Sequence, residues 1–330
     1  MNTFQILTDG LCDMPDSWLK NHPQITVVDT PITVSKNAES IVLRGLKPTD
    51  FPQVAAYIDK GYSAHTSCPC IYMADDDPSD DLLQFPSVER ITRSFLDQGK
   101  DVIYVAMSGT LSSAYDHVSA LYRELAPEYP DRSVICVDSH CMSTGLGLLL
   151  MDIVDYISEN NISRPEDLVP FIEKTRGGIA HIFSWSEFSY VRKSGRVPLL
   201  PAFLGGALHF QPFCSNEYDD RKNGERLLTP VKSTVRGKEK FAKLTAAFVK
   251  KTIIDPKGTI IVSHGDVQEF ADTIAARIQQ ALPEAKILYG PEWRVSSGIQ
   301  VHGGPTSVHI NFHREQPNCY SSTCDIVKGL

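Results

Sequence analysis

Residues 105–115 read Val105-Ala106-Met107-Ser108-Gly109-Thr110-Leu111-Ser112-Ser113-Ala114-Tyr115. The segment begins inside an apolar run typical of a buried strand (101–107) and continues into a pattern that predicts an amphipathic helix over 111–125. A strand that turns directly into a helix points free backbone N–H groups and the positive end of the helix dipole at the turn. Ser108 and Gly109 therefore either cap the helix or form a seat for an anion.

The same order of strand, polar loop and helix occurs twice more. Residues 3–7 predict a strand that leads to Asp9 and a helix ending at Lys20, and residues 133–137 lead to Asp138 and a helix over 142–160. Alternation of this kind predicts a largely parallel sheet, at whose carboxyl edge ligands bind. We expect the loops at Asp9, Ser108 and Asp138 to meet there.

The rest of the chain predicts further elements, and residues 259–289 complete a second α/β unit. Further strands are predicted at 25–34, 179–185, 226–230, 259–263 and 286–289. Further helices are predicted at 48–60, 87–98, 238–251 and 268–281. Residues 295–305 predict a strand or strand pair that ends in a tight loop around His302. The pattern breaks near 160–165, which predicts an N-terminal domain of residues 1–162 and a C-terminal domain of residues 163–330.

Composition limits the class of protein. The chain has 330 residues, of which 42% are hydrophobic and 22% charged, so it is long enough to bury a large core. Its formal net charge of −8 argues against nucleic acid and anionic membrane surfaces as partners. The first residues lack the pattern of a signal peptide, and prolines and glycines interrupt the longest uncharged stretch, 197–214. We expect a cytoplasmic protein without stable membrane insertion.

The sequence predicts no metal centre and no cofactor. Its eight cysteines lack a disulfide rhythm, and neither Cys68-Pro69-Cys70 nor the pair Cys319 and Cys324 has the paired spacing of a structural zinc site. The acidic segment 75–81 has no regular ligand spacing and fits a solvated loop. His65 is close to Cys68 and Cys70 in the sequence, so a metal site formed by these three residues stays an open alternative.

Three features each have a plain and a functional interpretation. Thr66-Ser67 fits a turn or a helix cap as well as a ligand contact. His302, beside Gly303-Gly304-Pro305, fits a structural histidine or a ligand contact on exposed backbone. The run 197–214 fits plain core or the wall of a pocket for an apolar ligand.

Taken in order, these features resemble the DegV family of fatty-acid-binding proteins over nearly the whole chain. No single motif carries the resemblance, but their order along the chain does. The motifs are Thr8-Asp9, Asp13-Met14-Pro15, Thr66-Ser67-Cys68-Pro69, residues 108–115, Asp138-Ser139, Ser194-Gly195-Arg196, residues 231–236 and His302-Gly303-Gly304-Pro305.

The resemblance implies a two-domain α/β fold, with a parallel sheet in the N-terminal domain, a mixed second domain and a long-chain fatty acid between them. It implies a carrier, not an enzyme, that presents the fatty acid to a fatty-acid kinase for acyl-phosphate formation. The carboxylate contacts it implies are Thr66, Ser67, Ser108, the amide of Gly109 and His302. It places Asp9, Arg196 and Arg236 in support of the site or facing the partner.

Elementary chemistry agrees with this implication. A fatty acid needs a few donors at one end and an apolar tunnel, where burial contributes about 0.8 kcal/mol per methylene. The alternative is a serine hydrolase that acts on a lipid or ester through Ser108 and His302, with Asp9 or Asp138 as the acid. The chain lacks the GxSxG turn that such an enzyme would favour.

Overall fold

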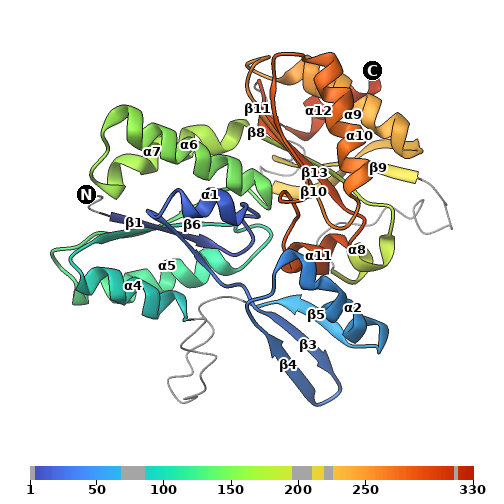
Figure 1. The fold of residues 1–330 in the computed structure, drawn as a ribbon. Helices are drawn as coiled ribbons and strands as arrows, with labels where there is room; N and C mark the ends of the chain where they lie inside the picture. The colour runs from blue at the N-terminus through green and yellow to red at the C-terminus, as the bar shows by residue number, and fades with distance from the viewer. Residues whose placement is uncertain (1–3, 68–85, 195–209, 219–225, 316–318) are drawn as a thin grey trace.

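The computed structural model describes residues 4–67, 86–194, 210–218, 226–315 and 319–330, whose strands form three sheets (Figure 1). Several features predicted from the sequence lie outside these residues. They are Cys68 and Cys70, the acidic segment 75–81, Arg196 and most of the run 197–214.

The first sheet has four parallel strands, as the alternating pattern predicts. Its order is β2 (Ile25–Val28), β1 (Phe4–Asp9), β6 (Asp101–Ala106) and β7 (Val134–Asp138). All six residues of β1 are buried because helices cover both faces of the sheet.

Two layers of helices cover this sheet (Figure 1). One face packs against α1 (Asp16–Lys20) and α6 (Thr144–Asn160), and α7 (Val169–Thr175) packs on α6. The other face packs against α4 (Val88–Asp97) and α5 (Ala114–Leu125). Short 3-10 turns occur at Pro48–Asp50, Ala126–Glu128, Pro165–Leu168 and Arg176–Gly178.

The strand predicted over 25–34 is wrong as a single element. The chain leaves the first sheet after Val28 and bends before Pro31, whose ring removes a backbone donor. It then enters a separate antiparallel sheet of β4 (Glu39–Leu43), β3 (Ile32–Lys36) and β5 (Ser63–Thr66). Helix α2 (Phe51–Asp59) packs on this small sheet.

The third sheet is mixed and draws its strands from the second half of the chain. Its order is β10 (Arg226–Arg236), β9 (Phe210–Tyr218), β8 (Ile179–Ser184), β13 (Val308–His313), β11 (Thr259–His264) and β12 (Lys286–Leu288). One face packs against α9 (Lys238–Thr252), α10 (Gln268–Ala281) and α12 (Tyr320–Lys328). The opposite face contributes to the core that α6 also enters.

Helix α6 therefore joins the first and third sheets. Gly145, in its first turn, lies against His181 of β8, and Gly147 lies against Met14. Thr144 Oγ1 donates a hydrogen bond of 2.7 Å to Asn311 Oδ1 on β13. These two glycines therefore let α6 pack closely on its neighbours. The boundary predicted between residues 162 and 163 stays a prediction.

The strand predicted over 295–305 is wrong, because the segment forms helix α11 (Ser297–Gly303). Ser296 Oγ caps the helix by accepting from the amide of Ile299. Ser297 Oγ donates to the carbonyl of Lys47, and Gln300 Nε2 donates to the carbonyl of Pro48. The β-branched residues favour a strand locally, but contacts with a distant segment stabilise the helix.

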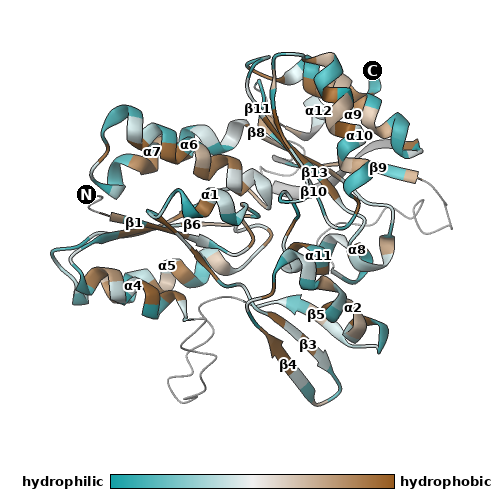
Figure 2. Ribbon diagram, viewed as in Figure 1, coloured by the Kyte–Doolittle hydropathy of each residue, from teal (hydrophilic) through white to brown (hydrophobic). Residues whose placement is uncertain are grey.

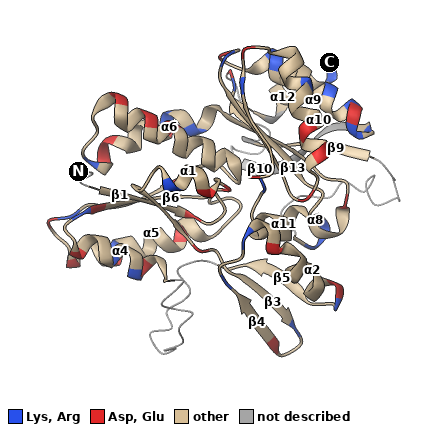
Figure 3. Cartoon of the chain, viewed as in Figure 1, with Lys and Arg blue, Asp and Glu red and all other residues tan. Residues whose placement is uncertain are grey.

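Hydropathy and charge follow the layers. Strand β6 is largely apolar, β13 alternates apolar and polar residues, and polar residues gather on the outer faces of the helices (Figure 2). In Figure 3, Lys and Arg are interspersed with Asp and Glu on the outer helices. Among the described residues, no helix combines the length and the apolar character needed to cross a bilayer.

Candidate functional site

A cavity opens between the first and third sheets, at the carboxyl edge of the first. Its empty space is about 920 Å3, part of it open to solvent. Residues from all three sheets and from α11 line it: Asp9, Leu11, Thr30, Thr66, Ser67, Met107, Leu111, Ser112, Ser113, Ala114, Met142, Phe183, Trp185, Val191, Ser194, Ile299, His302, Gly303, Ser307 and His309.

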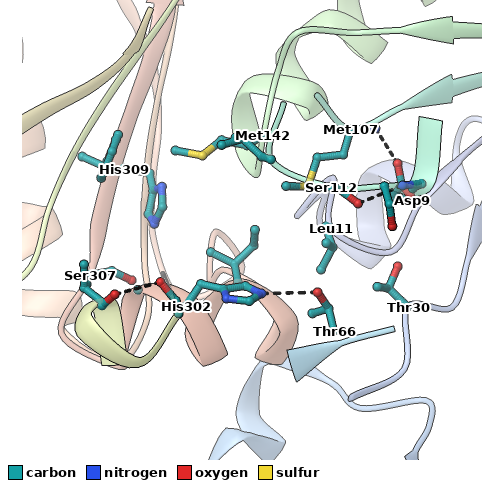
Figure 4. Close-up of a pocket in the computed structure, with 18 of the residues that line it drawn as sticks. Asp9, Leu11, Thr30, Thr66, Met107, Ser112, Met142, His302, Ser307 and His309 are labelled. Atoms are coloured by element: carbon teal, nitrogen blue, oxygen red, sulfur yellow. Dashed lines mark hydrogen bonds between the residues drawn. The ribbon is translucent and has the colours of Figure 1, made fainter. Parts of the chain in front are cut away.

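Thr66 and His302 meet at one side of the cavity, although 236 residues separate them in sequence. Thr66 Oγ1 lies 3.3 Å from His302 Nε2, within hydrogen-bonding distance (Figure 4). Thr66 ends β5, and His302 lies in the last turn of α11. A hydroxyl and an imidazole placed together can both donate to one carboxylate.

Gly298 allows this meeting. A Cβ at Gly298 would lie 2.5 Å from Leu11 Cδ2 and 3.1 Å from Thr66 Cγ2, so any larger residue would require these side chains to shift. Ser67 also lines the cavity, and its Oγ lies 2.6 Å from Thr33 Oγ1 of β3. The small antiparallel sheet thus holds both predicted hydroxyls at the cavity.

Asp9 lines the cavity at the end of β1. Its carboxylate accepts from Tyr104 Oη at 2.9 Å and from the amide of Met107 at 2.5 Å. Burial outweighs these hydrogen bonds and raises the pKa of Asp9 to about 6. Below that pH the side chain keeps its proton, which removes a negative charge that would repel an anionic ligand.

The loops after β1, β6 and β7 meet, as predicted. The Met107 amide binds Asp9, and the Gly109 amide donates to Asp138 Oδ1 at 3.2 Å. The amide of Ser139 in turn donates to the carbonyl of Ala106. The turn at Ser108 is therefore held by its neighbours in the sheet.

Ser108 and Gly109 are not among the residues that line the cavity. Ser108 is fully buried, and its Oγ lies 3.0 Å from Thr110 Oγ1. Helix α5 begins at Ala114, three residues later than predicted, because the chain first turns through residues 108–112. This turn places Ser112 at the cavity surface, where sequence reasoning had expected Ser108.

The start of α5 borders the cavity. Ser112, Ser113 and Ala114 all line it, and Ser112 Oγ accepts from the amide of Ala114 at 3.2 Å. The positive end of a helix dipole and the free N–H groups of the first turn favour an anion here. It is therefore Ser112 and Ser113, and not Ser108, that border the cavity in this segment.

Much of the remaining lining is apolar or aromatic. Sequence reasoning missed most of these residues because they lie on separate elements, among them β8, β13 and α8 (Phe188–Ser194), and no local pattern indicates that these elements meet. The unpredicted lining residues include Leu111, Met142, Phe183, Trp185, Val191, Ile299, Ser307 and His309.

The remaining predicted residues lie elsewhere. Arg236 is exposed at the end of β10 and does not line the cavity. The hydrolase alternative pairs Ser108 with His302, but only His302 lines the cavity, so the structure gives that alternative no support. In the described ranges, no three His, Cys, Asp or Glu side chains are grouped as a metal site would require.

Comparison with protein families identifies one model that matches residues 82–315, that of the DegV family of uncharacterised proteins. The DegV domain-containing protein CPE0026 of Clostridium perfringens is 24% identical over 196 residues, which are 59% of this chain and 64% of that protein. The DegV domain-containing protein YteA of Lactococcus lactis is 22% identical over 314 residues, 93% of this chain and 96% of that protein.

Solved structures share the fold. A stearic-acid-binding protein from Eubacterium ventriosum has a TM-score of 0.70 at 20% identity and covers 97% of this chain and 99% of its own. A DegV family protein from Eubacterium eligens loaded with heptadecanoic acid has a TM-score of 0.71 at 17% identity, over 94% of this chain and 100% of its own. At these identities the likeness establishes the fold alone.

Proposed function

Because this chain belongs to the DegV family, we propose that it is a carrier that binds a long-chain fatty acid in the cavity between its first and third sheets. The observation that carries the proposal is the division of the lining into two parts. Polar donors come from Thr66, Ser67 and His302 and from the start of α5, and apolar and aromatic side chains form most of the rest. A carboxylate with an acyl tail has the same two parts.

We assign the carboxylate to Thr66, Ser67, Ser112 and His302. Ser112 takes the place of Ser108 because it lines the cavity, and the Gly109 amide already donates to Asp138. Hydroxyl and imidazole donors suit a carboxylate that must later be released, since a buried pair of arginines would bind it more tightly. The acyl tail would lie along the apolar side chains, among them Leu111, Met142 and Ile299.

A carrier of this kind has no reaction of its own. We propose that it works in the cytoplasm and presents the carboxylate to a fatty-acid kinase, which forms the acyl phosphate. Incubation of the loaded protein with ATP and a fatty-acid kinase should give an acyl phosphate. If several such kinases leave the bound fatty acid unmodified, presentation to a kinase is excluded. Fatty-acid binding itself is tested separately, by native mass spectrometry and titration calorimetry.

Native mass spectrometry of the purified protein tests the binding function most directly. We expect adducts with the masses of long-chain fatty acids, which disappear on delipidation and return when a fatty acid is added. A protein that is empty on purification and then binds no fatty acid would contradict the proposal.

Thr66→Val and His302→Ala should each weaken fatty-acid binding by about 1–3 kcal/mol, which is roughly 5- to 150-fold in Kd, because each removes a donor to a charged group. Titration calorimetry on delipidated protein measures the change. Thr49→Val and His117→Ala alter the same residue types at exposed positions and should leave Kd unchanged. Equal affinities for all four variants would place the carboxylate elsewhere.

A further inference from the structure

Three side chains that line the cavity bury a polar atom with no hydrogen-bond partner among the described residues. The atoms are Trp185 Nε1, Ser307 Oγ and His309 Nε2. The exposed fractions of these residues are 3%, 1% and 5%. A buried donor or acceptor without a partner lowers stability, because it has given up its hydrogen bond to water. Three in one cavity wall indicate that something bound in the cavity supplies the missing partner.

The three side chains belong to one patch. In the antiparallel pair of β8 and β13, His309 lies opposite Phe183 and Val308 lies opposite Ser184. Ser307 and Trp185 directly flank these strands at the same end, and residues two apart on a strand share a face. The Phe183 ring stacks on Trp185 at 5.6 Å and on His309 at 6.1 Å between centroids.

This patch begins beside His302 and extends away from the other residues of the proposed carboxylate site. Figure 4 shows Ser307 and His309 on the side of the cavity away from Thr66 and Thr30. Apolar lining residues such as Met142 and Ile299 also face the cavity. A ligand that reaches both places has a carboxylate at one end and a second polar group farther along an apolar chain.

The chemistry of the patch selects an uncharged oxygen. Trp185 Nε1–H can only donate, so the ligand atom must accept. Burial lowers the pKa of His309 to about 4, so its imidazole is neutral at physiological pH and does not attract a second carboxylate. Ser307 and a neutral imidazole can each donate or accept, which suits a hydroxyl or a ketone oxygen.

We propose that the cavity selects an acyl chain that carries a hydroxyl or oxo group along its length, with that oxygen bound by Trp185, Ser307 and His309. This inference rests on the proposed function, since it names the class of fatty acid that the same cavity takes. It makes the patch a determinant of specificity, because a plain alkyl chain would leave all three polar atoms without partners.

Competition binding on delipidated protein tests the inference. Stearic acid is compared with a positional series of monohydroxy and oxo stearic acids, which have the same chain length and carboxylate. At least one positional isomer should bind about tenfold or more tightly than stearic acid, because it satisfies buried donors that stearic acid leaves unpaired. If no isomer binds more tightly than stearic acid, water satisfies these atoms and the inference is overturned. If neither stearic acid nor any isomer binds, the proposed function itself fails.

Variants locate the effect. Trp185→Phe, Ser307→Ala and His309→Phe each remove one polar atom, and each should reduce the ratio of the two affinities several-fold. The measured quantity is the ratio of the affinities for the preferred isomer and for stearic acid, so a substitution that weakens both equally leaves it unchanged. Three separate substitutions keep the test valid if one variant misfolds. Ser94→Ala removes a hydroxyl at an exposed position of α4 that does not line the cavity, and it should keep the wild-type ratio. A preference that survives all three substitutions would overturn the assignment.

Discussion

Replacement of Gly145 by alanine should lower the free energy of unfolding by about 3 kcal/mol or more, the upper end of what overpacking costs. A Cβ at this position would lie 2.0 Å from His181 Cε1 and 2.9 Å from Asn311 Nδ2. His181 and Asn311 are both buried, and His181 Nδ1 lies 3.1 Å from Asn311 Nδ2. The His181 ring and the Asn311 amide cannot move away without disturbing the packing of α6 between the first and third sheets.

Urea unfolding of the delipidated protein measures this loss. Gly177→Ala is the matched control, because a Cβ there meets no atom within 4 Å. We expect this control to keep or slightly raise stability, since alanine restricts the unfolded chain more than glycine does. If Gly145→Ala is as stable as the wild-type protein, α6 does not pack against β8 as closely as the structure indicates.

Asp13→Asn should become more stable relative to the wild-type protein as pH rises. Asp13 Oδ1 accepts from the amide of Ser296 at 2.8 Å, and Oδ2 accepts from Ser143 Oγ at 2.5 Å, so this carboxyl ties the first loop to α6 and α11. Asparagine can keep both contacts, with its oxygen toward Ser296 and its amide toward Ser143.

The direction follows from the pKa. Burial raises the pKa of Asp13 from 3.8 to about 6, so the folded protein holds the proton more tightly than the unfolded chain. The resulting stabilisation is complete below pH 3.8 and is lost as pH rises through about 6. The variant carries no such proton, so the difference in unfolding free energy, variant minus wild type, should rise by roughly 3 kcal/mol between about pH 4 and pH 8.

Unfolding curves of both proteins across this pH range give the difference directly. Asp16→Asn changes the same functional group at an exposed position of α1, and its difference from the wild-type protein should stay flat. A flat difference for Asp13→Asn as well would show that the carboxyl is not held in an apolar environment. A difference that falls with pH would mean that its hydrogen bonds outweigh burial.

Part of the site could be predicted from the sequence. Asp9, Thr66, Ser67 and His302 all line the cavity, as their motifs and their order along the chain suggested. Ser108 could not be distinguished from Ser112, because both hydroxyls lie in one short turn and only the path of that turn decides which faces the cavity. Trp185, Ser307 and His309 gave no local signal at all.

The sequence by itself determined the first sheet, because each strand, polar loop and helix there follows a local period that short-range sterics and burial enforce. It also determined that the loops after β1, β6 and β7 meet, since parallel strands bring their carboxyl ends to one edge. Only the tertiary structure decided that residues 297–303 form a helix, which depends on contacts with Lys47 and Pro48, 250 and 252 residues away in the chain. The register between β8 and β13 was likewise decided by packing, because the pairing of His309 with Phe183 joins strands that no local pattern links.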